Sequence, residues 1–180
     1  MSRGFVKEED QEETPFIPAR AVLPVGEINY TTPVGYKELI EERKKLEGNL
    51  AEIKTDLEKE TRHERAILSG KLNLLNERIA TARILDPREQ PQEEVRFGAE
   101  VSFKFLSGPQ KGIVRKFQLV GVDEADIKKN KIAFVAPIAK ALTGKKVGET
   151  VNLSLGTQVQ KLEILNIEYP EGDTSNEKVN

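Results

Sequence analysis

Residues 31–57 read TTPVGYKELIEERKKLEGNLAEIKTDL, and this stretch decides the first half of the fold. Apolar residues recur in it at alternating spacings of three and four, the pattern of a helix that packs along one seam against another helix. The seam consists of Tyr36, Leu39, Leu46, Leu50, Ile53 and Leu57, interrupted by Arg43. Thr32 followed by Pro33 predicts the helix start, because threonine caps free amide groups and proline has none to leave unpaired.

A second seam follows and matches the first. Its members are Leu68, Leu72, Leu75, Ile79 and Ala82. If the chain folds back at residues 60–61, the seams meet in layers, with Ile53 facing Leu68 and Leu46 facing Leu75. We therefore expect an antiparallel coiled-coil hairpin over residues 31–86, with arms of roughly 25 residues and a length of about 37 Å. Asp86 before Pro87 should end the second helix, because proline disfavours helix at the residue before it.

From residue 96 the pattern changes to the alternation of β-strands. Val101, Phe103 and Phe105 fall on one face of a strand at 99–105. Further strands are expected at 113–120, 131–135, 150–155 and 159–169, with a short helix at 138–142 after Pro137. This order predicts an α+β domain over residues 95–169, in which a curved antiparallel sheet carries one short helix.

The two ends of the chain have a different composition. Residues 1–30 are acidic and then rich in proline, without helical or strand periodicity, so we interpret them as a flexible extension. The alternative is that apolar residues such as Phe16, Ile17 and Val22 dock on a partner. Residues 170–180 are polar and are expected to form a flexible tail.

The composition excludes several classes of protein. The chain has no cysteine, which removes disulfides, thiolate nucleophiles and zinc-thiolate sites. Its formal net charge of -2 argues against a general nucleic-acid binder. No run approaches the roughly 18 apolar residues of a membrane span, and the start lacks an apolar signal region. We expect a cytoplasmic protein without membrane contact.

Several segments resemble the Gre transcription elongation factors. Residues 29–39, NYTTPVGYKEL, resemble the start of that family's first helix. Residues 97–99, 122–126 (VDEAD), 131–132, 136–142 (APIAKAL), 144–149 and the segment ending at Tyr169 are similar to its C-terminal domain. The resemblance covers residues 29–169 and implies that the β-rich domain is FKBP-like.

The resemblance also implies a mode of action. Gre factors bind bacterial RNA polymerase as accessory factors and insert their hairpin through its secondary channel. Carboxylates at the tip are taken to help hold a second Mg²⁺ there, because Mg²⁺ prefers oxygen ligands and two metals activate water. On this basis we expect a monomer with no active site, stable metal or cofactor of its own. Mg²⁺ and nucleic acid would be met only inside the polymerase.

The expected tip departs from the family's pattern. Its recognisable stretch of glycine, aspartate, glutamate, asparagine, an acid and an aromatic residue is absent, and the hairpin is shorter. Four candidate carboxylates remain near the turn, Asp56, Glu58, Glu60 and Glu64. The alternative is that they are solvated charges interspersed with basic residues. The factor therefore either stimulates cleavage of backtracked RNA or plugs the channel without cleavage. His63 is interpreted as a surface residue.

Candidate polymerase-docking residues lie in the C-terminal half. Val135, Ala136 and Pro137 occupy the place of a serine-proline segment that is implicated in docking in the family, although Pro137 also fits a simple helix start. Asp123 and Glu124 belong to an expected exposed acidic turn that is either a second contact or merely solvated. An FKBP-type isomerase or chaperone is a less favoured reading, because the chain has no tryptophan for the floor of such a pocket.

Overall fold

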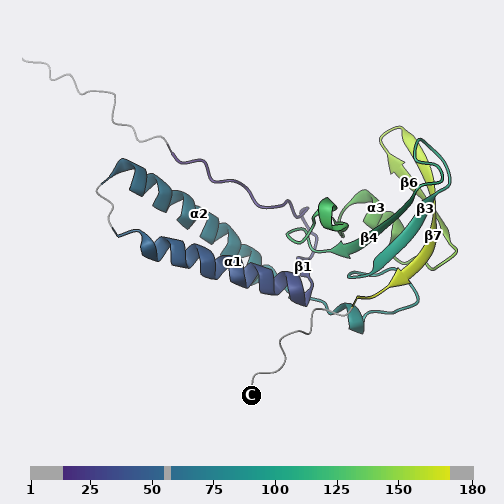
Figure 1. The fold of residues 1–180 in the computed structure, drawn as a ribbon, viewed down its shortest axis with the longest axis horizontal. Helices are drawn as coiled ribbons and strands as arrows, with labels where there is room; N and C mark the ends of the chain where they lie inside the picture. Colours follow the sequence, from purple (N-terminus) through teal and green to yellow (C-terminus); the bar gives the residue numbers. More distant parts are fainter. Residues whose placement is uncertain (1–13, 55–57, 171–180) are drawn as a thin grey trace, which may run out of the picture.

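The computed structural model describes residues 14–54 and 58–170, in which a helical hairpin projects from a β-rich domain (Figure 1). The hairpin consists of α1 (Pro33–Glu52) and α2 (Lys59–Thr81). Thr32 caps α1 as predicted, because its side chain accepts a hydrogen bond from the Gly35 amide, at 3.0 Å. The coiled-coil character of the hairpin stays a prediction.

The turn of the hairpin lies earlier than predicted. Residues 60–61 fall in the first turn of α2, so the predicted turn at these residues is wrong, while the predicted facing pairs stay a prediction. α1 ends at Glu52, after about 30 Å rather than 37 Å. Its last turn contains no basic residue of its own, and the Arg65 guanidinium of α2 donates to the Ile53 carbonyl instead, at 3.0 Å. A cation at this place stabilises the negative end of the helix dipole.

The base of the hairpin contains a small sheet that the sequence did not predict. β1 (Tyr30–Thr31) and β2 (Arg83–Ile84) pair in parallel, before α1 and after α2. α2 therefore ends at Thr81 and not at Asp86, because residues 83–84 are extended to make this pairing. Pro87 instead begins a short 3-10 helix, η2 (Pro87–Glu89).

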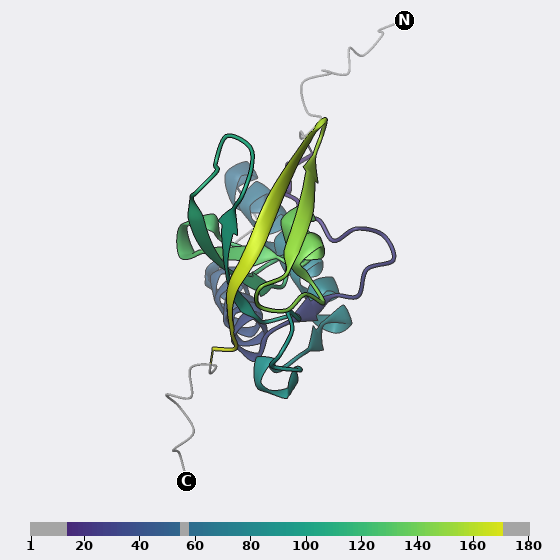
Figure 2. The ribbon, with the colours of Figure 1, turned by 90° about the vertical axis from the view of Figure 1, so that its right-hand side faces the viewer.

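The β-rich domain is a five-stranded sheet in the order β5-β4-β3-β7-β6. Its strands are β3 (Glu100–Phe105), β4 (Val114–Val120), β5 (Lys131–Ala133), β6 (Thr150–Leu155) and β7 (Gln158–Glu168), and Figure 2 shows the length of β7. The predicted antiparallel pairing holds for all pairs except β4 and β5, which run parallel. The chain reverses between them through η3 (Ile127–Lys129) and Asn130, whose φ of 54° is left-handed.

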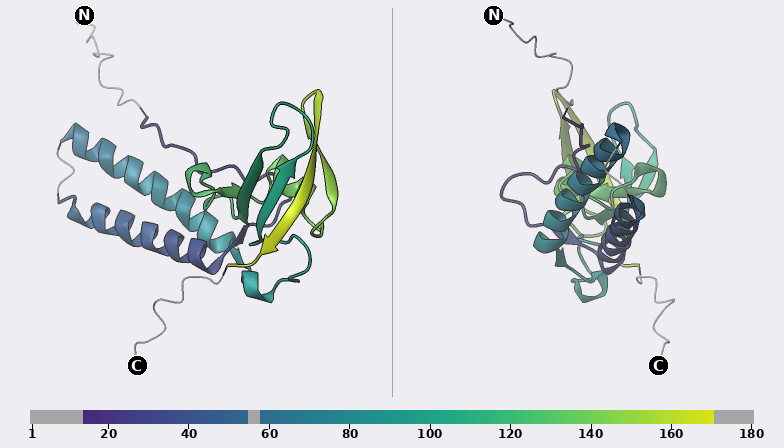
Figure 3. Two further views of the ribbon diagram at one scale, coloured as in Figure 1. Left: turned by 45° about the vertical axis from the view of Figure 1, so that its right-hand side comes forward. Right: turned by 90° about the vertical axis from the view of Figure 1, so that its left-hand side faces the viewer.

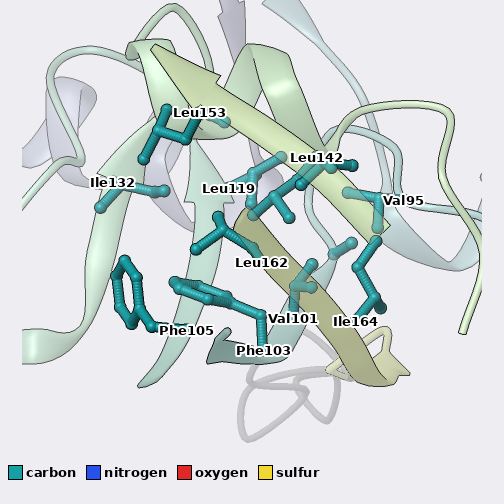
Figure 4. Packing of buried hydrophobic residues seen from close by; sticks show 13 residues of the cluster. Val95, Val101, Phe103, Phe105, Leu119, Ile132, Leu142, Leu153, Leu162 and Ile164 are labelled. Atoms are coloured by element: carbon teal, nitrogen blue, oxygen red, sulfur yellow. The ribbon is translucent and has the colours of Figure 1, made fainter. Parts of the chain in front are cut away.

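The core lies between the sheet and α3 (Pro137–Leu142), which packs near β6. The predicted inward residues Val101, Phe103 and Phe105 are buried there with Leu142 and Ile164 (Figure 4). The hairpin buries far less, since only Gly35, Leu39 and Leu75 are buried in its helices. Most of the fold's hydrophobic stabilisation therefore belongs to the β-rich domain, and the FKBP-like character of this domain stays a prediction.

The N-terminal segment differs from the predicted flexible extension. Residues 14–29 run beside α2 toward the β-rich domain (Figures 1 and 3). Ile17 lies so close to α2 that a Cβ on Gly70 would overlap its side chain. We name residues 14–29 the strap. Residues 1–13 and the predicted tail at 171–180 lie outside the described residues. None of the described helices is long and apolar enough to cross a membrane.

Tyr169 closes the β-rich domain onto the linker that leads in from the hairpin. Its hydroxyl donates to the Glu94 carbonyl at 2.6 Å and accepts from the Arg96 amide at 3.0 Å. Burial raises the pKa of Tyr169, while the hydrogen bond from Arg96 opposes the shift. Folding thus favours the neutral phenol.

Replacing Tyr169 with phenylalanine is expected to lower the free energy of unfolding by about 1 kcal/mol, because the part-buried Glu94 carbonyl and the exposed Arg96 amide lose their hydrogen-bond partner. The raised pKa adds a pH dependence. The stabilisation that comes from the neutral Tyr169 phenol is fully present below about pH 10, the pKa of tyrosine in the unfolded chain. It is lost as the pH rises through the higher pKa of Tyr169 in the folded protein. Urea unfolding of the parent and of Tyr169→Phe at pH 8 and at pH 10.5 tests the loss of stability and its pH dependence. Equal stability of the two proteins at pH 8 would contradict the prediction.

Candidate functional site

The acidic residues at the far end of the hairpin are exposed. Glu58 precedes α2 at its N-cap position, and its side chain makes no capping hydrogen bond. Glu60 lies in the first turn and Glu64 one turn later, so both are on one side of the helix. The fourth candidate, Asp56, lies outside the described residues. Figure 3 shows this end of the hairpin far from the β-rich domain.

A shallow hollow of about 460 Å³ adjoins these carboxylates on α2. Its lining is Lys59, Glu60, His63, Glu64, Ile67, Leu68 and Lys71. His63 is exposed, as predicted, and its side chain is part of the lining of this hollow. The carboxylates are therefore interspersed with bases above a partly apolar floor. Within residues 14–54 and 58–170, no three metal-ligating side chains are grouped to hold an ion.

Glu124 is buried at the joint between the hairpin and the β-rich domain, which corrects the predicted exposed acidic turn. Its carboxylate accepts from the Thr31 hydroxyl at 3.0 Å, the Thr32 amide at 2.9 Å and the Thr32 hydroxyl at 2.5 Å. The Gly121 amide donates to it as well, at 3.2 Å. A carboxylate has enough lone pairs to accept four hydrogen bonds, and here protein donors take the place of the water molecules that an exposed carboxylate would bind. Glu124 therefore anchors the start of α1.

Gly35 has its place because of this anchor. A Cβ at residue 35 would overlap the carboxyl end of the Glu124 side chain. The spacing of threonine, proline and glycine at 32, 33 and 35 thus has a physical basis in this chain: the hydroxyl caps the helix, the ring starts it, and the missing side chain admits the carboxylate.

Asp123 is also engaged within the chain rather than free for docking. The Arg20 guanidinium donates to its carboxylate at 2.8 and 3.0 Å, and Arg78 of α2 lies 3.3 Å from it. The side chains of all three residues are less than one-fifth exposed. Burial by itself would lower the pKa of Arg20, but the hydrogen bonds to Glu42 and Asp123 raise it above the usual value. Arg20 is thus held as a cation.

An aromatic cluster completes the joint and was not predicted. Tyr30 of β1 packs on Phe97 and Phe134 of the β-rich domain, with ring centroids 5.8 and 5.7 Å apart, and Phe97 lies 5.6 Å from Phe134. Such edge and tilted contacts add to simple area burial. The nearest sequence signal was the isolated aromatic at residue 30, which has no periodic partner and therefore could not be assigned.

The predicted docking segment after β5 is only partly available. Val135 and Ala136 are half-buried, and Ala136 packs against the core. Pro137 is exposed and occupies the first turn of α3, so the helix-start reading is correct for it. Ala136, at the N-cap, makes no side-chain capping bond. Of the five candidate docking residues, Pro137 alone presents an exposed side chain.

Arg43, inside the first seam, lies 3.8 Å from Glu47 and is half-buried. Arg43 is thus within ion-pair distance of a residue one turn along α1, which supports a structural role for it. The hairpin end and the joint are thus two separate features. The first exposes acidic groups, and the second determines where the hairpin points.

Comparison with known proteins supports the resemblance. A family model described as "Transcription elongation factor, GreA/GreB, C-term" matches residues 90–169. The transcription elongation factor GreA of Thermodesulfovibrio yellowstonii is 32% identical over 153 residues, which cover 77% of this chain and 95% of that protein. GreA of Caulobacter vibrioides is 29% identical, with 77% and 96% covered.

Solved structures are similar at a lower level. GreA factor homolog 1 of Thermus thermophilus matches with a TM-score of 0.36 and 21% identity, covering 79% of this chain and 99% of that one. A GreA/GreB factor of Nitrosomonas europaea matches with a TM-score of 0.37 and 20% identity, covering 78% and 98%. These scores carry no argument by themselves, and the assignment follows from the match to GreA over nearly its whole length. The chain belongs to the GreA/GreB family of transcription elongation factors.

Proposed function

We propose that this chain binds bacterial RNA polymerase, inserts the α1–α2 hairpin into the secondary channel and modulates elongation there. The observation that supports the proposal is the exposure of Glu58, Glu60 and Glu64 at the end of the hairpin, far from the β-rich domain. The relatives are named transcription elongation factors, and the proposed role in elongation agrees with those names.

In this proposal the polymerase provides the chemistry and the factor completes a site. Mg²⁺ at the polymerase active centre is the only metal involved, and exposed carboxylate oxygens are the ligands that it prefers. Each added carboxylate would strengthen the hold on a weakly bound second ion, which activates water for cleavage of backtracked RNA. The chain itself acts as an accessory factor, not as an enzyme.

A second candidate function is inhibition by occupying the channel without cleavage. The mixed lining of the hollow favours it, because Lys59 and Lys71 offset the negative field of Glu60 and Glu64. The length of α1, about 30 Å, favours inhibition as well, because a shorter hairpin carries its acidic residues less deeply into the channel. Binding would then slow nucleotide addition and leave the transcript intact.

The test uses purified polymerase from the same organism, stalled on a template and backtracked. The intact chain is added, and the lengths of labelled transcripts are followed with Mg²⁺ present. Shortened transcripts support cleavage, and slower nucleotide addition without shortening supports inhibition. Failure of the protein to associate with polymerase in gel filtration would refute both. Free labelled transcript incubated with the chain without polymerase is the control for contaminating nuclease.

A further inference from the structure

The strap makes one connection that neither the hairpin nor the β-rich domain explains. Arg20 donates to Glu42 of α1 at 2.8 and 3.1 Å, and to Asp123 of the β-rich domain at 2.8 and 3.0 Å. Arg78 of α2 shares the same Asp123 carboxylate. One guanidinium thus joins a helix of the hairpin to the other domain, and its planar fork fits two carboxylates at once.

The strap is held at several other points. The Arg78 guanidinium donates to the Ala21 carbonyl at 2.6 Å. The Asn29 side chain donates to the Arg78 carbonyl at 2.8 Å and to the Thr81 hydroxyl at 3.1 Å. Ile17 lies against Gly70, and a groove of about 870 Å³ runs between residues 17–23 and α2. The position of Arg20 is therefore set by both ends of the strap.

The geometry of the joint shows what this connection restrains. Glu124 fixes α1 at its first residues and Arg78 ties α2 to Asp123, but both contacts lie near the base of the hairpin, where they limit its tilt less than a contact farther along would. Glu42 lies ten residues beyond Thr32, which is about 15 Å along the helix. Arg20 therefore attaches α1 at a point farther along. Because α1 is about 30 Å long, a tilt of about 10° would move its far end by roughly 5 Å.

We propose that Arg20 is a positioning residue that fixes the angle between the hairpin and the β-rich domain, and so the place that the hairpin end reaches. Its effect on transcription rests on the proposed function, whereas the angle is measured on the free protein. The low exposure of Arg20 and Asp123 means that salt screens this contact less than a surface pair.

The angle is tested with spin labels at Asn49→Cys on α1 and Asn152→Cys on β6, both exposed positions in a chain without native cysteine. In Arg20→Ala the distance distribution should become about twofold broader, because the restraint that acts farthest along α1 is gone. The width for Arg20→Lys should lie between those of the parent and Arg20→Ala, since lysine keeps the charge but lacks the planar fork that binds two carboxylates. Arg115→Ala, an exposed arginine of β4, should leave the width unchanged. Equal widths for Arg20→Ala and the parent, with equal helicity by circular dichroism, would overturn the proposal.

The consequence for transcription is tested with the unlabelled variants. In Arg20→Ala the concentration giving half the maximal effect on polymerase should stay within about twofold, whereas the maximal effect should fall about tenfold, because misplacement by a few ångströms is costly at a reacting centre. A loss of affinity with an unchanged maximum would overturn the positioning role. If the parent protein has no effect on polymerase, the proposed function fails, and the distance measurement still decides whether Arg20 sets the angle.

Discussion

Replacing Glu124 with alanine is expected to lower the free energy of unfolding by about 3 kcal/mol, because four donors lose their acceptor at once. The hydroxyl and amide of Thr32, the Thr31 hydroxyl and the Gly121 amide all donate to this carboxylate in a buried place. Each buried donor left without a partner costs about 1–3 kcal/mol, partly offset where water enters the space. For a chain of this length the melting temperature should fall by roughly 10 °C.

The same substitution separates stability from control of the hairpin. Urea unfolding measures the first, and the label distance between α1 and β6 measures the second. Glu93→Ala, which removes an exposed acid from the linker, is the matched control and should change stability by less than about 0.5 kcal/mol. Equal stability of Glu124→Ala and Glu93→Ala would show that the buried carboxylate does not stabilise the joint.

Gly35→Ala approaches the same anchor from the other side. Alanine is favoured over glycine within a helix by about 1 kcal/mol, so helix propensity alone predicts a gain. The overlap of the new Cβ with Glu124 predicts a loss instead, because the carboxylate must leave its four donors. Gly48→Ala, in the same helix with open space around residue 48, is the control and should be stabilising. The opposite sign at residue 35 would identify the close contact as the cause.

The second large effect concerns the end of the hairpin. The triple variant Glu58→Ala, Glu60→Ala and Glu64→Ala is expected to lower the rate of transcript cleavage by at least about 100-fold. Each carboxylate that is removed takes away an oxygen ligand and so weakens the binding of the second Mg²⁺. Polymerase binding should change little. None of the three side chains is buried, and Glu58 makes no side-chain cap, so the helix should persist. Single-turnover cleavage on a backtracked complex is the measurement.

A control for charge alone accompanies this variant. Glu38→Ala, Glu41→Ala and Glu93→Ala together remove the same charge from exposed positions nearer the base of the hairpin and in the linker. This control should cleave at the parent rate. Undiminished cleavage by the tip variant would refute a role for these acids. If the parent inhibits without cleavage, the channel-occupying candidate holds.

Local sequence pattern determined much of this protein. The helix start at Thr32 and Pro33, the existence of two packed helices, and the bounds of β6 at 150–155 were predicted correctly from period and capping chemistry. These features depend on neighbours within a few residues, where spacing carries the information. The resemblance at residues 29–39 and 97–169 likewise indicated the family before any geometry was known.

Contacts between distant segments were decided only by the tertiary structure. Glu124 meets Thr32 across 92 residues and Arg20 meets Asp123 across 103, so no local pattern could show that these charges are buried and paired. The two-residue strands β1 and β2 are too short to have a period, and the parallel pairing of β5 depends on a left-handed turn at Asn130. Sequence alone therefore indicated the two long helices and the five strands of the β-rich domain, but not β1 and β2. Packing decided where the hairpin points, because burial of a charge depends on what the whole fold brings beside it.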